Sequence, residues 1–457
     1  MITQEDIDKA REDFPDLYKD VYTYEDLRTS KLLKIDEENW MSFYFPFYAL
    51  LSLPIKLLLQ AFQLNQSKAF VITNVILNIF ALYYFFMVYK RKSGFFSASL
   101  WTLLLLANPI LLYYRFISAE CTLFSLMLMS MVLWSENKYK KSALLISIAS
   151  TMNPTAMGTG IFLFIDYALS YWKNNRGNLF QKNNVLDMFQ LICCYVPSLI
   201  PFLINYHYFG VFYPSSNLAT VKGLFTRFLA YIFDLNLGLA SISIFLILLF
   251  IASFIYSVYK KEWKLFIQSG SVLFTILLFS ITVHINSGML NCARYVMWIF
   301  PAFVLVIVNT MNLVLQNKKV IYCATLLLCF AFQLALLVYN GFYGPREFNS
   351  LSKLILNNYP SLYINIHPST FNCRVNNIDG AYDIDDIVIY VNEKNGEVRK
   401  ILYFNDKTNY YSLLNKIGSS EDEDLSKLKE KIKSFNKKKF YYININKNAE
   451  IQYYLKD

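Results

Sequence analysis

The chain has 457 residues, of which 55% are apolar and 18% aromatic, and it carries a formal net charge of +10. This composition excludes a soluble globular protein and indicates an integral membrane protein. The positive charge does not indicate a nucleic-acid partner, because much of it lies in short connectors between apolar segments, where it sets membrane topology.

The chain opens with about 42 polar, acidic residues that lack the apolar core of a signal peptide. Residues 43–64 are apolar, but Pro46 and Pro54 interrupt them and Lys56 adds a charge. A proline removes a backbone donor and bends a helix. We therefore expect residues 43–64 to lie in the membrane interface rather than to cross it, and residues 1–64 to form an extracytoplasmic acidic loop with amphipathic interfacial helices.

Apolar segments of about 18–22 residues follow, a length that suits a helix crossing a ~30 Å hydrocarbon core. We expect crossings at about 69–89, 95–113, 117–134, 185–205, 238–258, 265–283, 295–315 and 319–340.

One further apolar segment, 143–172, has basic residues at both ends, so it must enter and leave on the same side. It is too short for two full crossings, and Asn153-Pro154 and Gly158-Thr159-Gly160 interrupt it. We expect two short helices that meet at a break partway through the bilayer, which persists only where it is buried in protein or lines a wet cavity. Residues 65–343 thus predict an all-α polytopic membrane domain of about nine to ten spans or half-spans.

The tail from residue 344 to 457 is polar and contains a hairpin signal, Asn395-Gly396, between the apolar stretches 386–390 and 398–404. A second strand pair is expected at 440–445 and 450–454, with a helix after Ser419 and Ser420 between the pairs. The tail is therefore predicted to be a small α+β domain.

Basic residues divide the connectors into two sets. Five connectors share fourteen Lys and Arg residues, whereas the alternating set holds four, Arg115, Lys222, Arg227 and Arg294. By the positive-inside rule the sparse set and the tail face outward. Ten crossings, two of them half-length, put residues 1–42 on the same, outer side as the tail. Because an acidic segment without a signal peptide should not be exported alone, we expect a first span upstream of Met1; the alternative is that residues 43–64 cross and residues 1–42 lie inside.

The outer connectors hold most of the polar residues that could take part in catalysis or ligand binding. Arg294 opens a span, and a guanidinium at that edge suits a phosphate, because its fork matches two oxygens. Arg115 lies between two spans, and Lys222 lies in an outer loop with a small, polar centre. Glu120 lies one turn inside a span, where an idle carboxylate is costly. For each of these residues the alternative is an ordinary one: an arginine that extends to lipid headgroups, or a helix-start acid.

Other candidates are weaker singly. Asp13 and Asp16 precede the interfacial helix, and a carboxylate there can deprotonate a hydroxyl group, although runs of this kind are usually solvated. Asp234 stands at a span edge, where an acid is usually solvated, and His207 opens an outer loop. Neither the seven cysteines nor the three histidines have a spacing that indicates a metal site.

Taken in order, the chain resembles the GT-C superfamily of polytopic glycosyltransferases, which includes protein O-mannosyltransferases and aminoarabinose transferases. The matching pieces are Asp13-Phe14-Pro15-Asp16-Leu17-Tyr18, Phe45-Pro46-Phe47-Tyr48, Pro109 to Arg115 to Glu120, and Arg294-Tyr295 to Pro301. The chain departs from the family in one respect, because the span that precedes the acidic loop is absent.

The resemblance implies transfer of a sugar from a polyprenyl-phosphate donor to a glycan, lipid or protein acceptor of the cell envelope, on the outer face of the cytoplasmic membrane and with inversion. Asp13 or Asp16 would be the base, and Arg294 with Arg115 or Lys222 would bind the donor phosphate. The remaining implied site-lining residues are Tyr18, Glu120, His207, Asp234 and Tyr295. It implies no cofactor beyond the lipid-linked substrate; some members use a divalent metal.

Two competing hypotheses are a transporter and a polymerase, ligase or flippase of cell-envelope glycans. The second group shares the substrates but lacks the large terminal outer domain expected here. A transporter or flippase of envelope glycan precursors would also be polytopic, and the broken segment 143–172 is typical of helices that hold a substrate at mid-membrane. Against transport, the chain shows no internal repeat and its polar groups gather at one surface, which favours interfacial chemistry.

Overall fold

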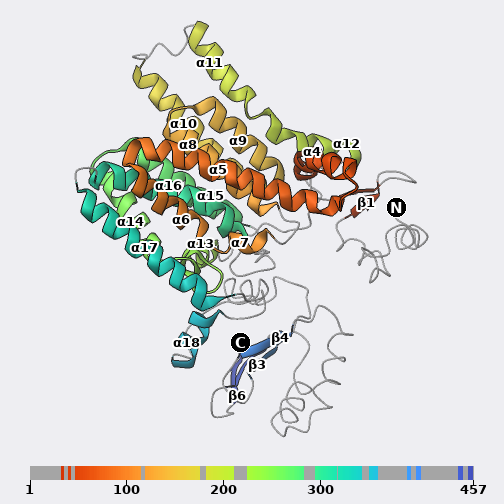
Figure 1. Cartoon of the computed structure of the whole chain (residues 1–457), viewed down its shortest axis with the longest axis vertical. Helices are drawn as coiled ribbons and strands as arrows, with labels where there is room; N and C mark the ends of the chain where they lie inside the picture. The colour runs from red at the N-terminus through yellow and green to blue at the C-terminus, as the bar shows by residue number, and fades with distance from the viewer. Residues whose placement is uncertain are drawn as a thin grey trace. The chain divides into compact units, whose positions relative to one another are not determined.

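The computed structural model describes residues 47–114, 119–174, 182–209, 224–281, 294–315, 318–341 and 349–358, together with six short strands (Figure 1). Within 47–358 the regular secondary structure of the described residues is entirely helical. Four helices are long and apolar enough to cross a membrane: α5 (Ala69–Ser93), α15 (Trp263–Ser280), α16 (Arg294–Leu315) and α17 (Lys319–Asn340). The bent pair α11 (Lys182–Cys193) and α12 (Ile200–Phe209) can supply a fifth crossing. The chain is therefore an integral multi-pass membrane protein.

Three predicted crossings are shorter than expected. They are α6 (Phe95–Leu106), α8 (Glu120–Ser135) and α14 (Ile244–Tyr259), with 12, 16 and 16 residues. Pro109 separates α6 from α7 (Ile110–Tyr113), because proline disfavours helical backbone in the residue before it. At the start of α14, the Ser243 hydroxyl accepts a hydrogen bond from the backbone N–H of Leu246 at 3.4 Å and caps the helix.

Helix α4 (Phe47–Ala61) covers most of the segment that the sequence places in the interface. Leu50, Leu53, Leu57 and Leu58 share one face and are between 43% and 55% exposed. Ser52, on another face, is buried. A short helix with an uncovered leucine face suits a position in the membrane interface, where lipid covers that face.

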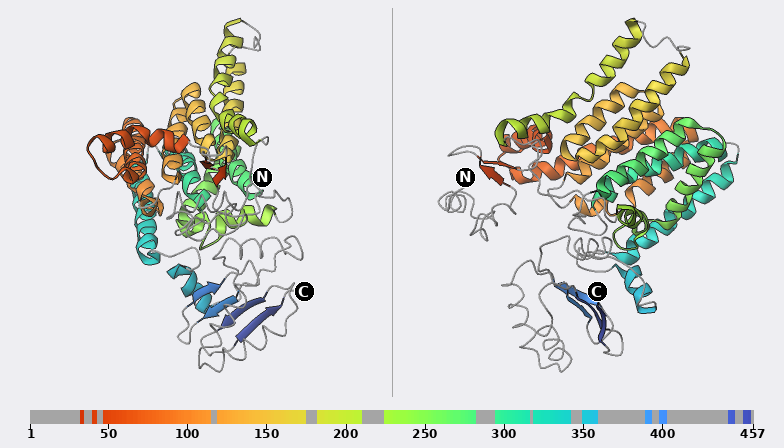
Figure 2. Two further views of the ribbon diagram at one scale, coloured as in Figure 1. Left: turned by 90° about the vertical axis from the view of Figure 1, so that its right-hand side faces the viewer. Right: turned by 180° about the vertical axis from the view of Figure 1, so that it is seen from behind.

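The first of two compact units comprises residues 1–88, 114–216 and 270–275. In it α8, α9 (Tyr139–Met152) and α10 (Met157–Asn174) run side by side (Figures 1 and 2). Two serine hydroxyls, of Ser130 and Ser142, meet at 2.9 Å and join α8 to α9.

The predicted break between α9 and α10 is present at Asn153, followed by the short 3-10 turn η2 (Pro154–Ala156). The prediction that Gly158 and Gly160 interrupt the segment is wrong, because both lie inside α10. Gly160 instead allows a close approach: a Cβ atom there would lie 3.0 Å from the ring of Tyr195, whose hydroxyl donates to the Gly160 carbonyl at 2.8 Å.

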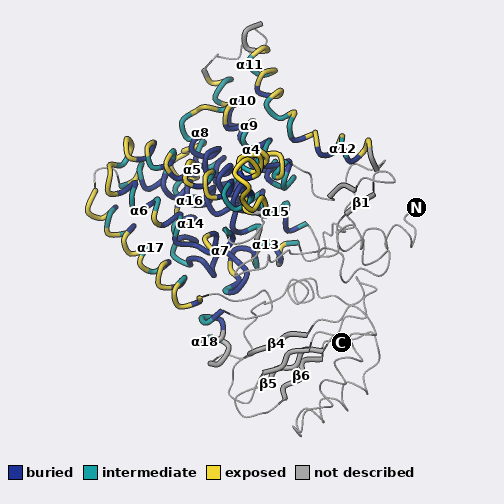
Figure 3. The backbone as a smooth tube through the Cα atoms, turned by 45° about the vertical axis from the view of Figure 1, so that its right-hand side comes forward, coloured by how far each residue is buried: buried dark blue, intermediate teal, exposed yellow. Residues whose placement is uncertain are grey.

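The second unit comprises residues 89–113, 217–269 and 276–457. Here α6 packs on α17 and α14 packs on α16. Helix α16 is the more enclosed, with 72% of its apolar window buried against 28% for α17, whose exposed residues form a continuous outer face in Figure 3. Stacked rings of Phe250 and Phe303, 4.5 Å apart, fix α14 against α16.

Asparagines join three further pieces of this unit, α13 (Leu224–Phe233), α17 and α18 (Ser350–Asn358). Asn349 donates its N–H to the Asn236 side chain at 2.8 Å and its amide to the Leu235 carbonyl at 2.7 Å. Asn340, at the end of α17, accepts from the N–H of Leu351 at 3.1 Å. The start of α18 is thereby held by the turn after α13 and by α17.

Six strands form three antiparallel pairs: β1 (Leu32–Lys34) with β2 (Trp40–Ser42), β3 (Ile389–Asn392) with β4 (Val398–Leu402), and β5 (Tyr441–Ile445) with β6 (Ile451–Leu455). The last two pairs occur where the sequence predicts them, with Asn395-Gly396 between β3 and β4. The helix expected after Ser419 lies outside the described residues, so the α+β tail domain stays a prediction.

Candidate functional site

Glu120 is the first residue of α8 and is 8% exposed. A carboxylate at a helix N-terminus is favoured by the unpaired backbone N–H groups and the positive end of the helix dipole. Glu120 is thus a buried acid at the start of an apolar helix, and an ionisable group at membrane depth usually has a function.

A chain of hydrogen bonds lies beside Glu120 and joins three helices of the first unit. Asn74 of α5 donates its amide to the Tyr48 hydroxyl of α4 at 2.8 Å, and its amide oxygen accepts from the Thr122 hydroxyl of α8 at 2.7 Å. The Tyr48 hydroxyl in turn donates to the Phe70 carbonyl at 3.3 Å. The interfacial helix is therefore tied to the start of α8, where Glu120 lies.

Tyr48 remains protonated in this position. Burial raises the pKa of its phenol above the ordinary 10.0, the neighbouring Cys121 and Glu120 raise it further, and the hydrogen bond from Asn74 opposes them. Tyr48 is joined through Asn74 to Thr122, which lies two residues after Glu120 in the first turn of α8. A neutral phenol at neutral pH can donate a hydrogen bond but cannot serve as a base.

In the second unit, Asp234 is 7% exposed and has a structural task. Its carboxylate accepts from the N–H groups of Asn236 and Leu237 at 2.9 and 2.8 Å, which closes the turn after α13. These contacts explain the residue's position without a substrate, and its predicted role in lining a site stays a prediction.

Arg227 of α13 is fully buried, and its Nε donates to the carbonyl of Ser280, the last residue of α15. A cation at a helix C-terminus is favoured by the helix dipole. Sequence reasoning counted Arg227 among the outer cations but did not include it in the site; an arginine inside the apolar run 224–233 was the available signal.

Tyr295, in the first turn of α16, is half-buried in an aromatic cluster. Its ring lies 5.6 Å from that of Phe279, which also meets Tyr231 at 4.7 Å and Trp298 at 6.0 Å. Arg294 begins α16, and its side chain is outside the description.

The other predicted residues are less informative. His207 is exposed in the last turn of α12. Five candidates lie outside the described residues: Asp13, Asp16, Tyr18, Arg115 and Lys222. Within the described ranges, no three His, Cys, Asp or Glu side chains gather as a metal site would require.

The structure brings together Glu120 and Tyr48, from two of the sequence motifs. Asn74 and Thr122, which connect them, were missed. The sequence contained a signal for Asn74. Asn74 and Asn78 are one helical turn apart in an otherwise apolar span, a spacing that indicates a buried polar face.

Among solved structures, the chain is similar to ArnT from Cupriavidus metallidurans, both bound to undecaprenyl phosphate and in the apo state. Each superposition covers 73% of this chain at 14% identity with a TM-score of 0.39. It covers 59% of the bound and 58% of the apo ArnT chain, so the chain spans about three fifths of their length. No family model matches the sequence, and no curated protein does.

Proposed function

We propose that this protein is an inverting membrane glycosyltransferase that uses a polyprenyl-phosphate sugar and modifies a cell-envelope acceptor on the outer face of the cytoplasmic membrane. One observation carries the proposal: Glu120, a buried acid on the side with few basic connectors, shares the first turn of α8 with Thr122. Hydrogen bonds join Thr122 through Asn74 to Tyr48 of α4, 72 positions before Glu120 in the sequence. Two pieces that the sequence orders as glycosyltransferase motifs thus share one location.

The proposed reaction is a single displacement. The oxygen of an acceptor hydroxyl forms a bond to the anomeric carbon while the bond from that carbon to the phosphate oxygen breaks. The hydroxyl proton passes to Asp13 or Asp16, and the polyprenyl phosphate leaves with the electron pair. Arg294, with Arg115 or Lys222, stabilises the charge that develops on the phosphate. Glu120 and Tyr48 border the donor sugar and orient it.

The test uses the full chain in native membranes with a radiolabelled polyprenyl-phosphate sugar. Asp13→Ala and Asp16→Ala identify the base, whose loss should lower transfer by about 10²–10⁴-fold. Arg294→Ala should lower it by about 10²–10³-fold. Glu120→Gln keeps the size and removes the charge, and Glu136→Gln is the matched control, since Glu136 pairs with Lys138 at 2.7 Å on the basic side. Full transfer in the Asp13, Asp16, Glu120 and Arg294 variants would end the site assignment.

A transporter is the second candidate, and the break between α9 and α10 favours it, because discontinuous helices often hold substrates within the membrane. Sealed vesicles separate the two functions. A transporter accumulates labelled glycan lipid on one side without a new covalent product, whereas a transferase yields labelled acceptor.

A further inference from the structure

We infer that the break between α9 and α10 lines an outward-facing aqueous pocket, and that its backbone carbonyls and the Asn153 amide bind the sugar hydroxyls of the donor. The identity of the ligand rests on the proposed function; the existence of the pocket does not.

The break leaves polar backbone groups without their helical partners. Pro154 has no N–H to offer the Ser150 carbonyl, its partner in a continuous helix. The Thr155 N–H donates to the Asn153 side-chain oxygen at 3.2 Å instead of to the Thr151 carbonyl. Two carbonyls at the end of α9 therefore require donors from elsewhere, since unpaired carbonyls in a bilayer are costly.

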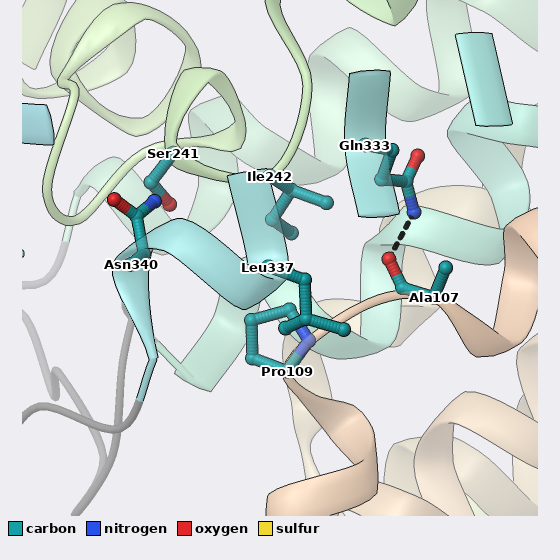
Figure 4. A pocket seen from close by; sticks show the side chains of 7 residues that line it. All are labelled: Ala107, Pro109, Ser241, Ile242, Gln333, Leu337 and Asn340. Carbon is teal, nitrogen blue, oxygen red and sulfur yellow. Dashed lines mark hydrogen bonds between the residues drawn. The ribbon is translucent and has the colours of Figure 1, made fainter. Parts of the chain in front are cut away.

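The proline break at Pro109, between α6 and α7, shows how protein alone can meet that requirement. At the end of α6, the Gln333 amide of α17 donates to the carbonyl of Leu104 at 2.9 Å. It also donates to the carbonyl of Ala107 at 2.5 Å, the bond shown in Figure 4. Asn108 donates its amide to the Leu105 carbonyl. The α6 break is thus closed by side chains.

The α9 break is open in comparison. Met152, Asn153, Pro154 and Thr155 are half-buried, although Ala149 and Ala156 on either side are fully buried. Among the described residues, no hydrogen bond involves the Asn153 amide N–H₂ group; its oxygen accepts from Thr155. The break offers donors and acceptors side by side, which matches hydroxyl groups, because each hydroxyl both donates and accepts.

Helix pairing places the break level with Glu120. Ser130 and Ser142 touch across the antiparallel helices α8 and α9. Glu120 lies ten residues before Ser130 and Met152 lies ten residues after Ser142, so both lie at the same end of the helix pair. Helix α4, which carries Tyr48, also contacts α9. The buried acid, the interfacial tyrosine and the open break therefore share one end of the first unit.

Cysteine labelling tests the pocket without any assay of transfer. Thr155→Cys in the full chain is treated with a membrane-impermeant maleimide, on intact cells and on everted vesicles, against the wild-type baseline. Ile161→Cys is the control, because Ile161 lies on an apolar face of α10 and is 46% exposed, so it should meet lipid. We expect Thr155→Cys to react on intact cells and Ile161→Cys to stay at baseline. Baseline labelling of Thr155→Cys, or labelling only in everted vesicles, would overturn the pocket.

Protection then tests the ligand. A polyprenyl-phosphate hexose at about ten times its Kd should slow the labelling of Thr155→Cys about tenfold, and polyprenyl phosphate without sugar should protect much less. Equal protection by both lipids, or by neither, would overturn the sugar assignment. If Thr155→Cys is labelled and protected in membranes where wild-type chain transfers no sugar, the reaction is wrong and the binding site stands.

Discussion

Asn74 provides the sharpest test of the link between α4 and α8. It is fully buried and bonds Tyr48 and Thr122 at 2.8 and 2.7 Å. Side-chain hydrogen bonds within membranes contribute about 0.6 kcal/mol on average and about 1.7 at most. Asn74→Leu removes both while keeping a similar volume, so we expect a loss of about 1–3 kcal/mol in the free energy of unfolding.

The same helix supplies the control. Asn78 is also buried, one turn further along α5, but its amide makes a single long bond to Ser125 at 3.4 Å. Asn78→Leu should therefore lower the free energy of unfolding much less than Asn74→Leu. Both variants are compared by reversible unfolding in mixed micelles, with transfer activity measured in parallel.

A double-mutant cycle isolates the bond itself. Tyr48→Phe removes only the hydroxyl, and its coupling with Asn74→Leu should be about 0.6–1.7 kcal/mol. If the bond positions α4 for the reaction, Asn74→Leu also loses transfer while Asn78→Leu keeps it. Zero coupling, or equal losses in the two asparagine variants, would refute the argument that this network joins the interfacial helix to Glu120.

Three further variants probe the second unit. Gln333→Leu should cost about 1–3 kcal/mol in the same unfolding assay, because the carbonyls at the α6 break lose their donor; Leu328→Ala, on the exposed face of α17, should be near neutral. Asp234→Asn retains the accepting oxygen, so the free energy of unfolding should not change. Lost transfer in this variant would show that the charge acts in the reaction, whereas unchanged transfer would assign the residue to the turn alone. Gly238→Ala should lower the yield of folded protein strongly, since its Cβ would lie 2.5 Å from the Ala230 carbonyl; wild-type yield would contradict this packing.

The helices were predictable where local chemistry decides them. Apolar length located α5, α16 and α17, and Asn153-Pro154 located the break, because proline acts on its own neighbours. Gly160 was wrongly predicted to interrupt the helix. A glycine is needed there because the ring of Tyr195, 35 residues later in the sequence, packs against it. A glycine that allows packing cannot be told from a glycine that ends a helix by local pattern alone.

The candidate site likewise has features that the sequence predicts and features that depend on packing. The outward side of Glu120 is a prediction from the distribution of lysine and arginine, which the sequence shows directly. The proximity of Glu120 to Tyr48 cannot be predicted in this way, because it depends on which faces of α4, α5 and α8 pack together. The turn held by Asp234 was within reach, since an aspartate two residues before a paired N–H is a local pattern.

The short length of α8 and α9 bears on how a substrate could reach the Glu120 carboxylate. With 16 and 14 residues, α8 and α9 are about 24 and 21 Å long, against a hydrocarbon core of ~30 Å. Their connector carries the Lys138–Glu136 ion pair, with the Lys138 side chain 46% exposed, which holds that end at water. The shortfall therefore falls at the opposite end, where Glu120 and Asn153 lie. In the proposed transferase, a recess at this end would let the donor sugar reach Glu120 while its lipid phosphate stays at the membrane surface.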